Sequence, residues 1–117
     1  MDQKWKILYY KTSQGTDPVH DFIDSLDEKI KAKIIDALDL LEEFGVRLGL
    51  PHAKKLTGTP LWELRVVGSG NIRIFYVAVV SKTFLLLHGF QKKKQKTNRK
   101  EIKIAIFRLK EHVERSK

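Results

Sequence analysis

The chain has 117 residues, 42% of them hydrophobic and 32% charged, and a formal net charge of +9. This length predicts one domain spanning residues 1–117, and the hydrophobic fraction is too high for a disordered chain. The sequence has no cysteine, which excludes disulfides and thiolate metal sites. It also has no apolar run of about 18 residues and no signal-peptide pattern, so we expect a cytoplasmic protein without membrane contact.

The N-terminal part of the chain predicts a strand followed by two helices. Residues 4–11 read as a strand, in which Trp5, Ile7 and Tyr9 alternate with Lys4, Lys6 and Leu8. Asp17 and Pro18 suit the N-cap and the first position of a short helix. A capping-box pattern at residues 25–28 marks the start of a second, longer helix, which Gly45 ends.

The remainder predicts a connector, three strands and a last helix. Residues 46–60 form a basic connector rich in glycine and proline. Three apolar segments predict strands, at residues 61–67, 72–80 and 83–90. Gly-Ser-Gly-Asn between the first two is a hairpin signal, and the continuous apolar run of the third suits an internal strand buried on both faces. The last helix is expected to open at Thr97 or Asn98.

This order of elements predicts an α+β fold. We expect a small, twisted antiparallel sheet of about four strands, with two N-terminal helices and a C-terminal helix. In the simplest arrangement of this kind the helices lie on one side of the sheet. The sequence contains no internal repeat and no low-complexity linker that would divide the chain.

Charge is distributed unevenly along the chain. Residues 17–43 contain nine acids and three bases, whereas residues 46–100 contain twelve bases and one acid, Glu63. A region this cationic attracts phosphate backbones and speeds encounter with nucleic acid, although surplus lysine can also serve solubility alone. We interpret the basic region as a nucleic-acid surface.

Bases near the predicted strand ends could form a site for RNA cleavage without a metal ion. The catalytic candidates are Arg73, Arg65, Lys55, Lys54 and His88, and the RNA-binding candidates are His52, Lys92, Lys93, Lys94 and Lys96. In such a reaction a base deprotonates the 2′-hydroxyl, cations stabilise the phosphate, and an acid protonates the leaving oxygen. The planar fork of arginine suits two phosphate oxygens. Glu63 alone is a poor magnesium site, so we expect no metal and no cofactor.

Each candidate also has a structural explanation. Arg65 could pair with Glu63, and Arg73 could be a solvated turn residue. His88 could be a buried histidine whose hydrogen bonds are satisfied, and Lys92–Lys96 could be a solvated charge run. Periodicity and charge alone therefore indicate only a basic α+β domain that binds nucleic acid.

Several short motifs follow one another in a recognisable order. They are KKLTG at Lys54–Gly58, LWELR at Leu61–Arg65, IRIFY at Ile72–Tyr76 and LLHGFQKK at Leu86–Lys93, followed by Lys-Thr before the last helix. As a set they resemble the phage-derived HigB-like branch of the RelE/ParE toxin superfamily, over about residues 4–113. The resemblance implies a RelE-like fold and a toxin that cleaves mRNA in the ribosomal A site without metal. It also implies a cognate antitoxin, often a helix-turn-helix, HigA-like protein, through which the pair binds operator DNA.

The resemblance carries over to particular residues only in part. Arg73 matches the most consistent phosphate-binding arginine of RelE-like toxins, and Arg65 matches a basic position on the preceding strand. Other basic positions are matched by Lys54 or Lys55, Lys92 and Lys93. No tyrosine follows Tyr76, so the C-terminal tyrosine of RelE has no counterpart here, and the general acid and base stay open.

Two further functions stay open at this point. One is a ParE-like toxin that inhibits DNA gyrase and cleaves nothing. The other is a nucleic-acid-binding module without catalysis. The basic strand ends favour the mRNA endonuclease, because a protein inhibitor need not concentrate cations there.

Overall fold

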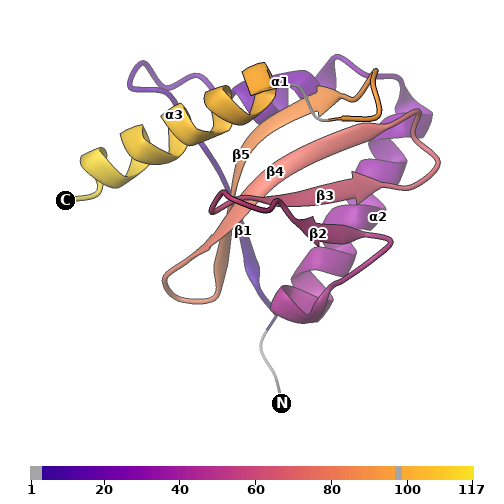
Figure 1. The fold of residues 1–117 in the computed structure, drawn as a ribbon, viewed down its shortest axis with the longest axis horizontal. Coiled ribbons are helices and arrows are strands. Elements are labelled where there is room, and N and C mark those ends of the chain that lie inside the picture. The colour runs from indigo at the N-terminus through magenta and orange to yellow at the C-terminus, as the bar shows by residue number, and fades with distance from the viewer. Residues whose placement is uncertain (1–3, 97–98) are drawn as a thin grey trace.

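The computed structural model describes residues 4–96 and 99–117, which form a five-stranded sheet with three α-helices (Figure 1). The strands are β1 (Lys6–Tyr9), β2 (Ala53–Lys55), β3 (Trp62–Val66), β4 (Ile72–Val79) and β5 (Thr83–Gln91), arranged across the sheet as β1-β5-β4-β3-β2. The helices are α1 (Pro18–Asp24), α2 (Glu28–Phe44) and α3 (Arg99–Arg115), with a short 3-10 turn, η1 (Gly45–Arg47). This arrangement confirms the predicted α+β class. No helix in the described residues is long and apolar enough to cross a membrane.

Two strands differ from the predicted sheet. β1 runs parallel to β5, with Ile7 opposite Phe84, so the sheet is mixed and not wholly antiparallel. β2 is an additional edge strand, antiparallel to β3, inside the segment predicted as a connector. Neither the direction of β1 nor the presence of β2 is indicated by the residues around it in the sequence. A three-residue strand is too short to show an alternation, and the direction of β1 is set by a partner far along the chain.

Most local helix signals act where they were expected, with one exception. Asp17 caps α1 through its carboxylate, and Gly45 ends α2 with a φ of 59°. The capping box placed the start of the second helix at Ser25, which is wrong. Asp27 is the N-cap, and its carboxylate accepts the backbone N–H of Ile30 at 2.9 Å. Ser25 instead ends α1, because its hydroxyl donates to a backbone carbonyl of that helix.

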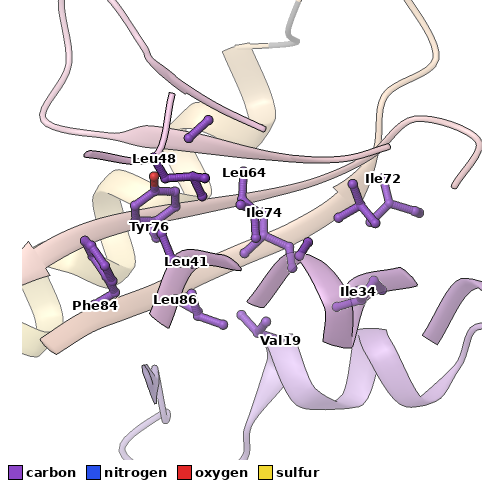
Figure 2. Close-up of a cluster of buried hydrophobic side chains, with 13 residues drawn as sticks. Val19, Ile34, Leu41, Leu48, Leu64, Ile72, Ile74, Tyr76, Phe84 and Leu86 are labelled. Atoms are coloured by element: carbon purple, nitrogen blue, oxygen red, sulfur yellow. The ribbon is translucent and has the colours of Figure 1, made fainter. Parts of the chain in front are cut away.

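The helices cover both faces of the sheet, so the expectation of helices on one side only is wrong. On one face α1 and α2 place Val19, Ile34 and Leu41 against the sheet (Figure 2). Buried partners from the strands include Leu64, Ile74, Tyr76, Phe84 and Leu86. On the other face α3 packs Ala105 into a second cluster, with Phe75, Val77, Leu85 and Leu87. From Phe84 to Leu87, successive residues of β5 point to opposite faces, and this apolar run meets helices on each. This confirms its prediction as an internal strand.

A bulge between β4 and β5 sets which side chains share a face near the hairpin. Tyr76 pairs with Leu86, but Phe75 pairs with His88, so β5 carries one extra residue at this point. Directly paired residues lie on the same face of a sheet. The shift therefore places His88 on the face of the second cluster. The expected opening of the last helix at Thr97 or Asn98 lies outside the described residues, and α3 is described from Arg99 onward.

Candidate nucleic-acid interface

The two arginines of the predicted site lie opposite each other on neighbouring strands. Arg65 near the end of β3 pairs with Arg73 near the start of β4. Their neighbours Leu64 and Ile74 point into the cluster beneath α1 and α2, so both arginines lie on the opposite face. Their side chains are 29% and 14% exposed, respectively. The fold thus brings the leading phosphate-binding candidates together at an accessible place.

A buried carboxylate lies between these arginines. The Glu63 side chain is only 3% exposed, and its Oε1 accepts a hydrogen bond from Nε of Arg65 at 3.2 Å. The same oxygen lies 3.7 Å from Nε of Arg73, which is an ion-pair distance and too long for a hydrogen bond. The possible Glu63–Arg65 pair was recognised from the sequence. The contact of the same carboxylate with both arginines was not.

Arg73 is held in a largely desolvated position. Its Nε is buried and makes no hydrogen bond within the part of the chain that the structure describes, while Nη1 donates to the carbonyl of Ile72 at 3.2 Å. Burial lowers the pKa of Arg73 below its ordinary value, Glu63 opposes that decrease, and Arg65 adds to it. Arginine nevertheless stays protonated in proteins. Arg73 is therefore a fixed cation with unused donor capacity.

Three shallow hollows join along this end of the molecule. The first has a volume of about 360 Å³ and is lined by residues that include Arg65, Asn71 and Arg73. Asn71 and Arg73 also line the second, of about 290 Å³, together with Lys92–Lys94. The same lysines line the third, of about 270 Å³, with Lys96. We call this continuous surface the basic groove and define it by Arg65, Arg73, Lys92, Lys93, Lys94 and Lys96.

The lysine run of the groove is attached to the hairpin by backbone contacts. The N–H of Lys92 donates to the carbonyl of Asn71 at 2.9 Å. The side-chain amide of Gln91 donates to the carbonyl of Gly70 at 2.8 Å. These bonds place the start of the run beside the turn that precedes Arg73. The arrangement supports the interpretation of this run as part of a binding surface.

Two candidates from the basic connector lie beside the arginines. Lys54 of β2 is directly opposite Glu63 and therefore lies on the face that carries the arginines. The carbonyl of His52 accepts the backbone N–H of Arg65 at 2.7 Å, so His52 adjoins the same row. The fold places both next to the pair, on the edge of the sheet.

Lys55 is not brought to this face. It pairs with Trp62, whose side chain packs against the cluster beneath α1 and α2. Its ammonium donates to the carbonyl of Thr59. Alternation along a strand therefore separates Lys55 from Lys54, although the two are adjacent in sequence.

The side chain of His88 extends from β5 to α3, where each of its ring nitrogens contacts a side chain of that helix. Its Nε2 is 2.8 Å from Oε1 of Glu101, and its Nδ1 is 3.3 Å from Nη1 of Arg108. Arginine only donates, so Nδ1 must accept, and the proton of the neutral ring is on Nε2. Burial lowers the pKa of His88 and outweighs the opposing effect of Glu101. This geometry favours the structural explanation of His88, as a residue that attaches α3 to the sheet.

Sequence reasoning missed Glu101 and Arg108 as partners of His88. They follow it by 13 and 20 residues, and no spacing rule connects a strand to a helix at those distances. Within residues 4–96 and 99–117, no three His, Asp or Glu side chains gather closely enough to hold a metal ion. The basic groove presents guanidinium and ammonium cations, and the carboxylate of Glu101 also lines its third hollow.

Comparison with known proteins places this chain in a family. The family model described as phage derived protein Gp49-like (DUF891) matches residues 21–110, which include both arginines and the whole basic groove. The chain belongs to this family. The Gp49-like family is a family of RelE/HigB-type toxins. No curated protein matches the chain in sequence.

The fold of this Gp49-like protein is similar to that of a solved RelE structure. It is a chain of the crystal structure of the archaeal RelE–RelB complex from Pyrococcus horikoshii OT3, with a TM-score of 0.56 and 20% sequence identity. The match covers 78% of the present chain and 98% of that chain. At this identity the likeness concerns the fold, and it confirms the expected RelE-like arrangement.

Proposed function

We propose that this protein is the toxin of a type II toxin–antitoxin pair, of the HigB-like branch, and that it cleaves mRNA on the ribosome without a metal ion. The observation that carries the proposal is the cross-strand pair of Arg65 and Arg73, which lines the basic groove with part of each side chain exposed. A single RNA strand in this groove meets cations along its path. The chain belongs to a family of RelE/HigB-type toxins, and this membership favours RNA over other polyanions as the ligand of the groove.

In this reaction the 2′-oxygen bonds to the adjacent phosphorus while the bond from phosphorus to the 5′-oxygen breaks. One proton leaves the 2′-hydroxyl and another is delivered to the 5′-oxygen. Arg73 and Arg65 stabilise the extra negative charge that develops on the phosphate. His52 and Lys54 adjoin the arginines and are the candidates for moving the protons. We assign His88 to the attachment of α3, and we leave Lys55 outside the reaction.

The proposal includes partners and a place of action. The partners are the ribosome with its mRNA and a cognate antitoxin, which we expect to be a helix-turn-helix, HigA-like protein that also binds operator DNA. The similar archaeal structure is a RelE–RelB complex, which supports a partner of the antitoxin kind. Translation occurs in the cytoplasm, so we propose a cytoplasmic protein.

The experiment is single-turnover cleavage of ribosome-bound mRNA, mapped by primer extension. Arg73→Ala should slow cleavage by about 100- to 1000-fold, the usual loss when one donor to a transition state is removed. Arg73→Lys should restore only part of the rate, because lysine keeps the charge and loses the fork. The matched control is Arg47→Ala, which removes an exposed arginine from η1, outside the groove.

Folding must be measured alongside, because the Arg73 side chain is largely buried against Glu63. Thermal melting of each variant provides that control. Wild-type cleavage by a folded Arg73→Ala would remove Arg73 from the mechanism. Growth arrest with intact mRNA and double-strand DNA breaks would instead identify a gyrase inhibitor.

A further inference from the structure

We infer that Glu63 is a positioning residue for the reaction, which fixes the orientation of both phosphate-binding arginines. The inference deepens the proposed function and rests on it. One oxygen of this carboxylate, Oε1, lies 3.2 Å from Nε of Arg65 and 3.7 Å from Nε of Arg73. Two cations on different strands are thus tied to one buried anion.

The register of the hairpin explains why these three side chains meet. Glu63 and Arg65 are two residues apart on β3 and therefore lie on one face. Arg73 is directly opposite Arg65 on β4. Like charges directly opposite each other on a sheet repel, and a carboxylate within reach of both offsets that repulsion. A carboxylate that is 3% exposed is in turn tolerated because cations adjoin it.

The arginine atoms that contact Glu63 determine which guanidinium nitrogens stay available to bind the substrate phosphate. Both arginines approach Glu63 through Nε, one edge of the planar guanidinium. Fixing that edge fixes the plane of the fork, because the five N–H donors of arginine have a rigid arrangement. Among residues 4–96 and 99–117, the terminal nitrogens of both arginines have no hydrogen-bond acceptor except at Nη1 of Arg73, which donates to the carbonyl of Ile72. Glu63 thereby prearranges the two terminal nitrogens of Arg65 and Nη2 of Arg73 for one phosphate.

This role predicts a separation between binding and rate. If Glu63 contributed only its charge, its neutralisation would make the groove more cationic, strengthen RNA binding and speed cleavage or leave it unchanged. If Glu63 orients the forks, its neutralisation leaves RNA binding equal or stronger but slows the chemical step. A small loss of alignment at the reacting centre is sufficient for a large loss of rate.

The test is Glu63→Gln, which keeps the size of the side chain and one acceptor oxygen. Affinity for mRNA-programmed ribosomes should be unchanged or higher, while saturating single-turnover cleavage should fall by about tenfold or more. Glu43→Gln, which neutralises an exposed carboxylate near the end of α2, is the control for net charge. Unchanged cleavage in a folded Glu63→Gln would overturn the inference, as would a parallel loss of affinity and rate.

A second measurement does not depend on catalysis. In ¹⁵N NMR spectra, the Nε–Hε signals of Arg65 and Arg73 should differ from those of exposed arginines. Both should move toward the exposed values in Glu63→Gln. Movement of the Arg65 signal alone would show that Glu63 does not hold Arg73. If the wild-type protein does not cleave RNA, the proposed function fails, and this measurement still decides whether Glu63 orients the forks.

Melting curves establish whether Glu63→Gln folds. If it does not, Glu63→Asp provides the same test, because it keeps the charge and withdraws the carboxylate by one methylene. Slower cleavage with unchanged affinity in Glu63→Asp supports positioning. Wild-type cleavage in that variant would show that the charge suffices wherever it lies nearby.

Discussion

On the face of the sheet that packs against α1 and α2, most side chains of β3, β4 and β5 are apolar and buried, whereas the opposite face changes along its length. There α3 covers a second apolar cluster around Leu85 and Leu87. Toward the β3–β4 turn that face instead carries Glu63, Arg65 and Arg73. The same strands therefore contribute to a core on one side, and to both a second core and a charged site on the other.

The difference shows where this fold can hold charges. Beneath a packed helix an unpaired ion loses its hydration, so those positions require apolar residues. At the end of the sheet near the β3–β4 turn, Arg65 and Arg73 each keep part of their surface in contact with solvent. The neighbouring carboxylate of Glu63 offsets the hydration that the buried part of each arginine loses. The helix-covered parts of both faces thereby provide stability, and the uncovered end of the second face carries the proposed chemistry. Substitutions in each part of the molecule test whether that separation holds.

The largest effect on stability is expected on the face covered by α1 and α2. Leu41 of α2 is 0% exposed within that cluster, so Leu41→Ala should lower the free energy of unfolding by about 2–5 kcal/mol. Leu50→Ala, at a leucine that is 67% exposed, should change it by no more than about 0.5 kcal/mol. Urea denaturation measures both. Comparable losses from the two leucines would contradict the assignment of this face as the main core.

A smaller effect is expected where α3 joins β5. His88→Asn should lower the free energy of unfolding by about 1–3 kcal/mol, because Glu101 and Arg108 lose a partner. Burial lowers the pKa of His88 in the folded protein below 6.5, its ordinary value, so the unfolded chain takes up that proton more readily. The stability that neutral His88 contributes is therefore present above pH 6.5 and lost as the pH falls through the folded-state pKa.

Denaturation curves above and below pH 6.5 measure this contribution. His88→Asn should lose less stability on acidification than the wild type, since it has no imidazole to protonate. An identical pH dependence in the two proteins would show that His88 does not couple folding to protonation. Cleavage that persists in a folded His88→Asn would agree with its structural role.

The smallest effect is expected from the lysines of the groove. Changing Lys92–Lys94 together to Gln should reduce the slope of log affinity against log salt by about 2, since each contact with single-stranded RNA contributes about 0.7. The matched triple is Lys4, Lys6 and Lys11, near β1, which should change the slope less. Equal changes from both triples would show that RNA responds to net charge and not to the groove. Titration of fluorescent RNA at several salt concentrations provides the slopes.

Much of the fold was predictable because its signals are local. The strands near 61–67, 72–80 and 83–90, the cap at Asp17 and the helix end at Gly45 all depend on residues within a few positions of one another. The capping box shows the limit of such reasoning. Ser25 and Asp27 are both good caps, and only the geometry of the turn between α1 and α2 decided that Asp27 caps the second helix.

The candidate site was predictable in composition but not in arrangement. Charge and motif order singled out Arg65, Arg73 and the lysines after β5, and the fold gathers them in one groove. The sequence did not distinguish Lys54 from Lys55, because either could match the basic position that the family carries before the leucine of the first motif. Strand pairing separated them, since adjacent residues of a strand point to opposite faces.

The sequence by itself determined the length and type of most elements, the concentration of cations in the second half of the chain, and the resemblance to a toxin family. These properties are written in hydrophobic period, composition and motif order, which need no knowledge of distant contacts. The tertiary structure alone decided the parallel pairing of β1, the placement of α3 on the other face, and the burial of Glu63 between two arginines. Each of those depends on segments far apart in sequence, which meet only after the apolar faces of the sheet have been buried.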